Sequence, residues 1–271
     1  MNIAVIYFSP TGNTAKIAQV IKENLVNLEN TVELIDITYH SKRLTKIYIE
    51  KYDAFLFGFP IHYWRAPRLI RDWLKTLNGQ GKRCSTFFTY GGVHVGSAHS
   101  DTISILAAQN FKVVSTAEFL AKHTYNIGGW HLLEDHPNIN DFNISKEFTQ
   151  KTYEKFLEKE VSEVEIESSR MTEEQLDKIE TMTKRAIYTP FREGNECSMC
   201  KTCEEICPAN AMDAEKGKPN RKLCIRCLSC IINCPDNVIK TKDMTPLFQM
   251  LMKLTKMNEE EIDQKKSKFY I

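Results

Sequence analysis

The sequence predicts two structured parts, an open α/β fold on a doubly wound, five-stranded parallel sheet and then a small α+β domain rich in cysteine. Two observations support this. Up to about residue 160, short apolar runs alternate with amphipathic stretches, which is typical of parallel strands joined by helices on both faces. Eight of the nine cysteines fall between Cys197 and Cys234. The length of 271 residues also suits about two domains.

Five short runs are the predicted strands, and they are residues 3–8, 31–37, 52–60, 84–92 and 111–120. The first and third are almost continuously apolar, as expected for parallel strands buried on both faces. The second alternates apolar and polar residues, and the third and fourth end at Gly or Pro. Polar loops after these strands would therefore meet at one edge of the sheet.

Apolar residues at helical spacing predict the helices between the strands. The first helix carries Ile17, Ile21, Leu25 and Leu28, the second carries Leu69, Ile70, Trp73, Leu74 and Leu77, and a third covers residues 98–109. Residues 123–145 lack a clear period and contain Gly128, Gly129 and Pro137, so we expect a long loop there. A helix over about 145–160 would close a first domain at residues 1–160.

The remaining chain divides by composition into three segments. Residues 161–187 are mainly acidic and predict a solvated connector, in which Thr172 and Gln175 form a capping box that starts a helix. Residues 188–243 hold the cysteine cluster. Residues 244–271 predict a helix followed by a lysine-rich, solvated tail.

Overall charge and hydropathy exclude several classes of function. The formal net charge of +1 gives no reason to expect nucleic acid or an anionic membrane as partner. No apolar run approaches the roughly 18 residues of a membrane span, and no secretory signal is visible. We therefore expect a cytoplasmic protein, in which clustered cysteines bind metal rather than form disulfides. Cys84, which begins a predicted strand, is expected to be a buried packing residue rather than a reactive thiol.

The clustered cysteines form two runs with one spacing, C-x2-C-x2-C-x3-C-P, repeated after 27 residues. This duplication predicts two similar halves related by a pseudo-twofold axis. The region resembles the bacterial two-cluster ferredoxins over about 50 residues. In that family the fourth cysteine of each run reaches the other cluster. The resemblance implies one [4Fe–4S] cluster on Cys197, Cys200, Cys203 and Cys234, and another on Cys207, Cys224, Cys227 and Cys230. Paired zinc sites are the alternative, although zinc usually uses two separated C-x2-C pairs.

A second motif, "SPTGNT" at residues 9–14, follows the first predicted strand and opens the first helix. Free N–H groups and the helix dipole favour a phosphate at such a junction. The loop lacks the G-x-x-x-x-G-K-[ST] and G-x-G-x-x-G motifs of nucleoside triphosphate and dinucleotide sites. It resembles the FMN phosphate loop of flavodoxins, which implies that Ser9, Thr11, Gly12, Asn13 and Thr14 hold the phosphate.

Two further loops fit this resemblance, "FPIHYWRAP" (59–67) and "TYGGVHVG" (89–96). Flavodoxins hold the isoalloxazine ring between aromatic side chains at these places, so Tyr63, Trp64 and Tyr90 are the candidates. The implied flavin-flanking residues are Pro60, Ile61, His62, Tyr63, Trp64, Thr89, Tyr90, Gly91 and Gly92. His94 and Tyr125 are weaker candidates for lining a flavin or substrate pocket. His94, His99, His123, His131 and His136 cluster in the sequence, either as a metal site or as ordinary polar loop residues.

Together the two resemblances match flavodoxin–ferredoxin fusion proteins, which are common in anaerobes. They imply an electron-transfer flavoprotein that relays electrons between two [4Fe–4S] clusters and FMN and exchanges them with redox partner proteins. The alternative is a flavin-dependent reductase of a small molecule, and a third is a redox sensor that binds a partner. No nicotinamide motif is visible, so direct reduction by NAD(P)H is not expected. A homodimer is left open, as are donor, acceptor and direction of flow.

Overall fold

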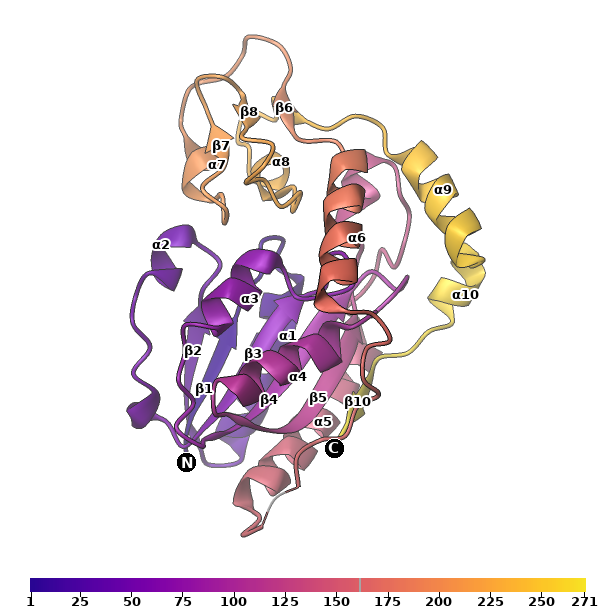
Figure 1. Cartoon of the computed structure of the whole chain (residues 1–271). Coiled ribbons are helices and arrows are strands. Elements are labelled where there is room, and N and C mark those ends of the chain that lie inside the picture. Colours follow the sequence, from indigo (N-terminus) through magenta and orange to yellow (C-terminus); the bar gives the residue numbers. More distant parts are fainter. Residues whose placement is uncertain (161) are drawn as a thin grey trace.

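A six-stranded sheet lies at the centre of the computed structural model, which describes residues 1–160 and 162–271. Its strand order is β10-β5-β4-β3-β1-β2 (Figure 1). Five strands run parallel, and they are β1 (Asn2–Tyr7), β2 (Thr31–Asp36), β3 (Ala54–Pro60), β4 (Arg83–Tyr90) and β5 (Lys112–Leu120). The predicted parallel sheet is therefore confirmed. Residue 161, where we expected the connector to begin, lies outside the described residues.

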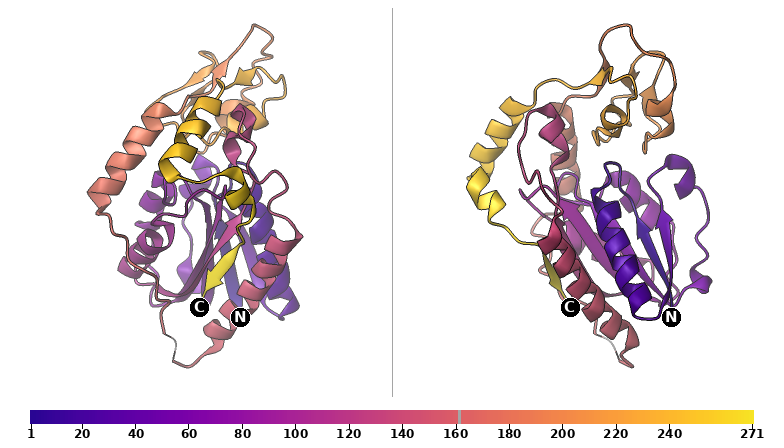
Figure 2. Two further views of the ribbon diagram at one scale, coloured as in Figure 1. Left: turned by 90° about the vertical axis from the view of Figure 1, so that its right-hand side faces the viewer. Right: turned by 180° about the vertical axis from the view of Figure 1, so that it is seen from behind.

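Two layers of helix enclose the sheet, as Figures 1 and 2 show. Helices α1 (Asn13–Asn27) and α5 (Ile139–Leu157) cover one face, where Ile17, Ile21 and Phe148 are fully buried. Helices α3 (Arg68–Leu74) and α4 (Ala98–Ala108) cover the other. The short α2 (His40–Arg43) and η1 (Ile49–Lys51) follow β2. Both faces of the central strands are buried, which explains their continuous apolar runs.

The central strands pack closely enough to need glycine at one point. Gly58 on β3 pairs with Phe87 on β4. A Cβ at Gly58 would lie 2.0 Å from the Phe87 ring. Cys84, at the start of β4, is fully buried, and burial raises the pKa of its thiol well above the ordinary value. The interpretation of Cys84 as a packing residue is therefore confirmed.

The sixth strand corrects the prediction of a five-stranded sheet with a solvated tail. Residues Lys268–Tyr270 form β10, which pairs antiparallel with β5 and makes the sheet mixed. Phe269 packs into the core on the α1 and α5 side, and Lys268 lies 3.4 Å from buried Glu118. A strand of three residues is too short to show an alternating pattern beside so many lysines. Its effect is to cover the edge of β5, which would otherwise be unpaired.

The segment 123–145 is also more structured than expected. It contains a 3-10 turn, η2 (Thr124–Gly128), and α5 begins at Ile139 rather than near residue 145. Asn138 and Asp141 form a capping box at this start. Asp141 is buried, so a polar residue lies on the inner face of the first turn of α5. The helical spacing of apolar residues that would reveal this turn in the sequence is therefore interrupted.

The cysteine-rich segment shows the predicted duplication in its backbone. The first half contains β6 (Phe191–Arg192), α7 (Thr202–Glu205) and β7 (Met212–Asp213), and each recurs 27 residues later as β8 (Lys218–Pro219), α8 (Ser229–Ile232) and β9 (Ile239–Lys240). Strand β6 pairs with β9, and β7 pairs with β8. Each half therefore gives one strand to each ribbon, as a pseudo-twofold arrangement requires.

This segment lies beyond the carboxyl ends of the parallel strands, while both termini lie near the opposite end (Figure 1). Helix α6 (Glu173–Ala186) leads up to it, and α9 (Thr245–Thr255) and α10 (Glu259–Asp263) lead back down to β10. The predicted capping box of Thr172 and Gln175 is present at the start of α6.

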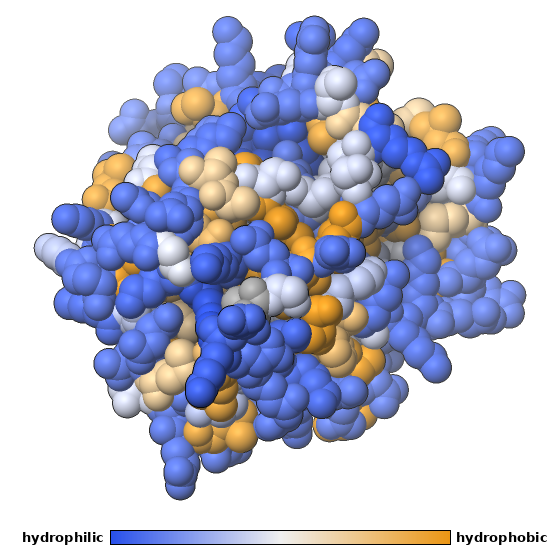
Figure 3. Space-filling model, turned by 60° about the horizontal axis from the view of Figure 1, so that its bottom comes forward, coloured by the Kyte–Doolittle hydropathy of each residue, from blue (hydrophilic) through white to orange (hydrophobic). Residues whose placement is uncertain are grey.

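The face shown in Figure 3 is mostly covered by hydrophilic residues, with small apolar areas between them. Within the described residues, no helix combines the length and the apolar character that crossing a membrane demands.

Candidate functional site

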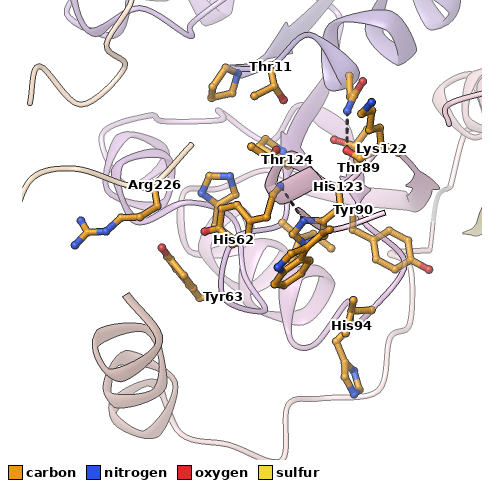
Figure 4. Close-up of a pocket in the computed structure, with 18 of the residues that line it drawn as sticks. Thr11, His62, Tyr63, Thr89, Tyr90, His94, Lys122, His123, Thr124 and Arg226 are labelled. Carbon is orange, nitrogen blue, oxygen red and sulfur yellow. Dashed lines mark hydrogen bonds between the residues drawn. The ribbon is translucent and has the colours of Figure 1, made fainter. Parts of the chain in front are cut away.

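A pocket of about 200 Å³ opens where the carboxyl ends of β1, β3, β4 and β5 meet the cysteine-rich segment (Figure 4). An open parallel sheet places its ligand at this edge. Most residues predicted to bind a flavin line it, and they are Thr11, Asn13, Thr14, Pro60, Ile61, His62, Tyr63, Trp64, Thr89 and Tyr90. Ser9, Gly12, Gly91 and Gly92 belong to the same loops but are not in the wall. The structure thus brings together three loops that are far apart in the sequence.

The first loop has the form of an anion cradle. Gly12 has φ +89°, which favours glycine, and no atom lies within 4 Å of where its Cβ would be. The Ala15 N–H donates to Ser9 Oγ at 3.0 Å. Within the described part of the chain, the N–H groups of Asn13 and Thr14 have no protein acceptor. Two donors at the positive end of α1 are therefore free for an anionic ligand.

The second loop presents two aromatic side chains on a strained turn. His62 and Arg65 exchange backbone hydrogen bonds of 2.8 and 3.2 Å, and Tyr63 and Trp64 between them have φ of 52° and 69°. Positive φ at both central residues is the type I′ geometry, which normally selects Asn or Gly. Aromatic residues here are therefore held by their surroundings, and such strain is typical of binding loops.

Buried ion pairs supply part of that restraint. Arg65 is fully buried, and its Nη2 lies 2.6 Å from Asp177 and 3.0 Å from Glu180 on α6. Arg71 on α3 donates to the same Glu180 at 2.6 Å. The composition of the acidic connector predicted a solvated segment, and the structure corrects this. Two of its carboxylates, on Asp177 and Glu180, anchor α6 to the loop that carries Tyr63.

The sequence did not single out the wall that follows β5. The pocket is lined here by Lys122, His123, Thr124, Tyr125 and Trp130. Only Tyr125 had been considered as a pocket residue, and His123 had been considered only as part of a histidine cluster. The ring centroids of His123 and Trp130 are 4.4 Å apart. The available signal was position, because these residues directly follow the carboxyl end of the fifth predicted strand.

Two of the three pocket histidines, His62 and His123, are uncharged at neutral pH, and His94 is the third. Burial lowers the pKa of His62 to about 4, and burial together with His62 lowers the pKa of His123 to about 3. Burial also raises the pKa of the neighbouring Tyr63 and Tyr125 phenols. The pocket therefore presents neutral imidazoles and neutral phenols to a ligand.

The histidines that cluster in the sequence separate in space. His94 and His123 line the pocket. His99 is buried between Thr116 and Glu118 at 2.6 and 2.9 Å, and His136 pairs with Asp141 at 2.6 Å. The described residues contain no group of three or more His, Cys, Asp or Glu side chains placed to hold a single metal ion. Of the two readings of these histidines, the described structure therefore favours ordinary polar residues.

The cysteines fall into two sets that differ in environment. Cys207, Cys224, Cys227 and Cys230 line one small cavity, which Pro190, Met212 and Leu228 help to close. Burial raises the pKa of Cys227 to about 12. The other set, Cys197, Cys200, Cys203 and Cys234, is more open, and Cys200 is exposed. The first set is the group of four that the ferredoxin resemblance assigns to one cluster.

The backbone between the cysteines repeats an unusual conformation. Met199 and Lys201 have φ of 57° and 60°, and their equivalents 27 residues later, Arg226 and Leu228, have φ of 58° and 57°. Non-glycine residues rarely adopt this region. Alternating right- and left-handed residues turn successive N–H groups into a concave nest, which is a recurrent setting for anions and iron–sulfur clusters.

Comparison with known proteins identifies the first part of the chain. Residues 4–123 match the family model of a flavodoxin domain, so the N-terminal part is a flavodoxin-like domain. Such a domain indicates an FMN-binding electron-transfer flavoprotein. None of the curated proteins compared with the chain matches it.

Several solved structures are similar to part of the chain. A flavodoxin from the domain Archaea is 19% identical, with a TM-score of 0.45, over 58% of this chain and 100% of that one. Flavodoxin 1 from Bacillus cereus is 20% identical, with a TM-score of 0.43, over 57% of this chain and 98% of that one. The rubredoxin oxygen:oxidoreductase of Desulfovibrio gigas is 21% identical, with a TM-score of 0.44, over 57% of this chain and 36% of that one.

Proposed function

We propose that this chain is an iron–sulfur flavoprotein that holds FMN in the pocket and one [4Fe–4S] cluster on each cysteine set, and relays electrons between them. The observation that carries the proposal is the adjacency of the two sites. Arg226 lies between Cys224 and Cys227 in the sequence and lines the pocket together with the flavodoxin-like loops. Cofactors that exchange electrons need such proximity, whereas unrelated structural sites do not.

The residues of the pocket fit FMN. The free N–H groups of Asn13 and Thr14 and the hydroxyl of Thr11 suit a phosphate ester. Tyr63, Trp64 and Tyr90 supply aromatic surface for the ring, and the Tyr90 side chain is mostly buried. His62 and His123 are neutral and add no charge beside the ring, which leaves Lys122 and Arg226 as the cationic side chains described in the wall. When bound, FMN exchanges one or two electrons, and iron–sulfur clusters exchange one at a time.

The cysteine sets fit clusters better than zinc. Four cysteines line the cavity, and Arg226 and Leu228 between them have the positive φ of a nest, a recurrent setting for iron–sulfur clusters. The Ala211 N–H already donates to Cys207 Sγ at 3.2 Å.

The protein's own residues position the cofactors and exclude water. Lys265 donates to the carbonyls of Gly92 and Val93 at 2.6 and 3.0 Å, which fixes the third loop from the C-terminal segment. Thr183 and Ile187 of the α6 region and Leu251 of α9 close the pocket from above. The acidic connector thus acts as a cover for the pocket.

The first test is the cofactor content of anaerobically purified protein. The proposal expects about eight irons, eight sulfides and one FMN per chain. Zinc without sulfide, or no flavin after reconstitution, contradicts the corresponding half. A Thr11→Val variant should bind FMN about ten-fold more weakly, because a hydrogen bond to a charged group contributes about 1.5 kcal/mol or more. Thr45→Val, at an exposed position after α2, is the matched control and should bind FMN normally.

A flavin-dependent reductase of a small molecule is the second candidate. The observation in its favour is the pair of phenols, Tyr63 and Tyr125, which stand in the pocket beside neutral histidines and are able to donate protons to a reduced substrate. Turnover of quinones or nitro compounds by the reduced protein would support it. Reduction that passes only to another redox protein supports the carrier, for which we propose cytoplasmic donor and acceptor proteins.

A further inference from the structure

The two cysteine sets have the same spacing but different surroundings. Cys224 and Cys227 are 9% and 8% exposed, and they line a small cavity together with the partly buried Cys207 and Cys230. Cys200 of the other set is exposed. We call these the buried set and the open set. Identical motifs in different environments are expected to have different redox roles, because potential depends on charge, hydrogen bonding and solvent exposure.

Only the buried set adjoins the pocket. Arg226 follows Cys224 by two residues and lines the pocket. Tyr63 lines the pocket from the sheet, and its hydroxyl donates to the carbonyl of Ile225 at 3.5 Å. Figure 4 shows Tyr63 and Arg226 on the same side of the pocket. Ile225 in turn lines the cavity of the buried set. No residue of the open set, and no neighbour of one, is in the pocket wall as described.

Cationic side chains flank the buried set. Arg226 is 2% exposed, and its Nη1 donates to the carbonyls of Arg221 and Cys224. Its buried Nε has no partner among the described residues. Arg43 reaches across from α2 and donates to the carbonyl of Pro208, next to Cys207. Two guanidinium groups thus stand beside one cysteine set.

Acidic side chains flank the open set, together with the cationic side chains of Arg192 and Lys201. Asp236 accepts from the backbone and hydroxyl of Ser198, each at 2.7 Å, between Cys197 and Cys200. Glu204 directly follows Cys203. At the position equivalent to Arg226 stands Met199, which has the same φ and is 40% exposed. The duplication therefore carries a cation in one half and an uncharged side chain in the other.

We propose that the buried set exchanges electrons with the pocket, that the open set exchanges them with outside redox proteins, and that Arg226 favours residence of the electron at the buried set. The inference rests on the proposed function. In this inference Arg226 is a positioning residue. It stabilises the reduced state of the cluster on the buried set and does not contact a substrate.

Electrostatics gives the reason for the direction. An added electron makes a cluster more negative, so a nearby cation stabilises the reduced form and a carboxylate destabilises it. Burial opposes reduction, because a low dielectric disfavours added charge, but the same low dielectric strengthens the attraction of a buried guanidinium. The open set also has cations nearby, since Arg192 Nη1 lies 3.5 Å from Met199 Sδ and Lys201 is exposed between Cys200 and Cys203. The difference therefore rests on Arg226, whose burial strengthens its attraction for an added electron and makes the buried set the better electron acceptor.

The number of electrons given and taken is equal in this order of transfers, and no bond forms or breaks at the clusters. An outside one-electron donor protein reduces the cluster on the open set. That cluster is oxidised again when its electron enters the buried set. Two such electrons, delivered one after the other, reduce one flavin, which takes its proton from water.

The test uses Arg226→Met, which copies the residue of the open half, with Arg170→Met, the same substitution at an exposed arginine, as matched control. Cluster potentials are measured by titration with electron paramagnetic resonance detection, and FMN affinity by fluorescence. In Arg226→Met, the electron-sharing equilibrium between the clusters should shift at least ten-fold toward the open set, or about 59 mV. FMN should also bind several-fold more weakly. Arg170→Met should change neither quantity. Unchanged values in Arg226→Met, or equal changes in both variants, overturn the inference.

Arg226→Lys keeps the charge and should retain most of the original potential difference. If Arg226→Met does not fold, Tyr63→Phe tests the same wall from the sheet side. It should alter FMN affinity and the resonance signal of one cluster only, and no change in either overturns the inference. Native protein that lacks clusters or FMN contradicts the proposed function itself. If the native protein contains both clusters and FMN, but Arg226→Met changes neither the cluster potentials nor the FMN affinity, only the order of electron transfer proposed here is contradicted.

Discussion

At the scale of single residues, His62 and His123 line the pocket and are otherwise surrounded by protein. Burial holds the pKa of His62 at about 4 and that of His123 at about 3, below the ordinary value of 6.5. An unfolded chain takes up a proton on each imidazole near pH 6.5, but the folded chain does not. The unfolded state therefore binds more protons between about pH 6.5 and 4, and acid favours unfolding.

This predicts that the free energy of unfolding falls as the pH drops from 7 to 5, by at most about 2 kcal/mol for each histidine. The double variant His62→Gln, His123→Gln should lose less stability over this range than the native protein. Urea unfolding at both pH values measures the difference. His131→Gln, at an exposed site, should behave like the native protein. A double variant with the native pH dependence would show that these imidazoles are solvated.

Site residues that belong to a local sequence motif could be predicted from the sequence. The "SPTGNT" loop and the aromatic pair Tyr63 and Trp64 were identified because they follow predicted strands. His123 was considered only as part of a histidine cluster and Arg226 not at all, since each reaches the pocket through contacts between segments that are distant in the sequence. Nothing in the local sequence shows that Arg226 differs from its equivalent, Met199, in facing the pocket.

At the scale of elements, α6 owes its position to buried charge. Glu180 is mostly buried and accepts from Arg65 and Arg71, which are themselves buried, and from Arg68. Arg65 Nε and Nη1 have no hydrogen-bond partner among the described residues, and Asp101 on α4 lies 3.8 Å from Nη1, so the two closer carboxylates that neutralise Arg65 come from α6. Removing one member of such a group leaves an uncompensated charge.

Glu180→Ala should therefore destabilise the protein by about 3 kcal/mol or more. Glu174→Ala, on the exposed side of the same helix, should stay within about 0.5 kcal/mol of the native value. Denaturant unfolding of both variants is the measurement, and FMN affinity is the second readout because α6 covers the pocket. Equal stabilities of the two variants would mean that the ion pairs do not hold α6.

The C-terminal strand β10 also depends on one polar residue. Ser267 is buried, donates to Asp141 at 2.6 Å and accepts from the N–H of Leu120 at 2.8 Å. Ser267→Ala leaves both partners unsatisfied, which should cost about 1–3 kcal/mol. Ser104→Ala, at an exposed position on α4, is the control and should have little effect. Thermal unfolding measures both, and a neutral Ser267→Ala would show that water replaces the hydroxyl.

Elements with a long periodic pattern were predictable, whereas those fixed by tertiary contacts were not. The five parallel strands and α1 follow from apolar runs and spacing. Strand β10 has only three residues, and α5 begins with a buried Asp141, so neither shows a pattern of its own. Likewise, the acidic connector has the composition of a solvated segment. Only the folded structure shows that its carboxylates pair with arginines of α3 and of the loop that precedes α3.

At the scale of the whole molecule, two parts with different sources of stability share one pocket. The sheet buries a large apolar core on both faces. The cysteine-rich segment has only two-residue strands and four-residue helices. Small domains with little core depend on their metal for folding. Loss of iron should therefore unfold the cysteine-rich segment first and weaken the pocket as a consequence.

We predict that removing iron with a chelator speeds hydrogen exchange across residues 191–240 and leaves the amides of β1, β3, β4 and β5 protected. FMN should then bind several-fold more weakly but should still bind, because the three flavodoxin-like loops remain while the wall with Arg226 is lost. Exchange measured by mass spectrometry before and after chelation, with FMN affinity in parallel, tests both statements. Unchanged exchange over residues 191–240 would mean that the segment folds without metal, and loss of protection throughout the sheet would mean that the two parts fold as one unit.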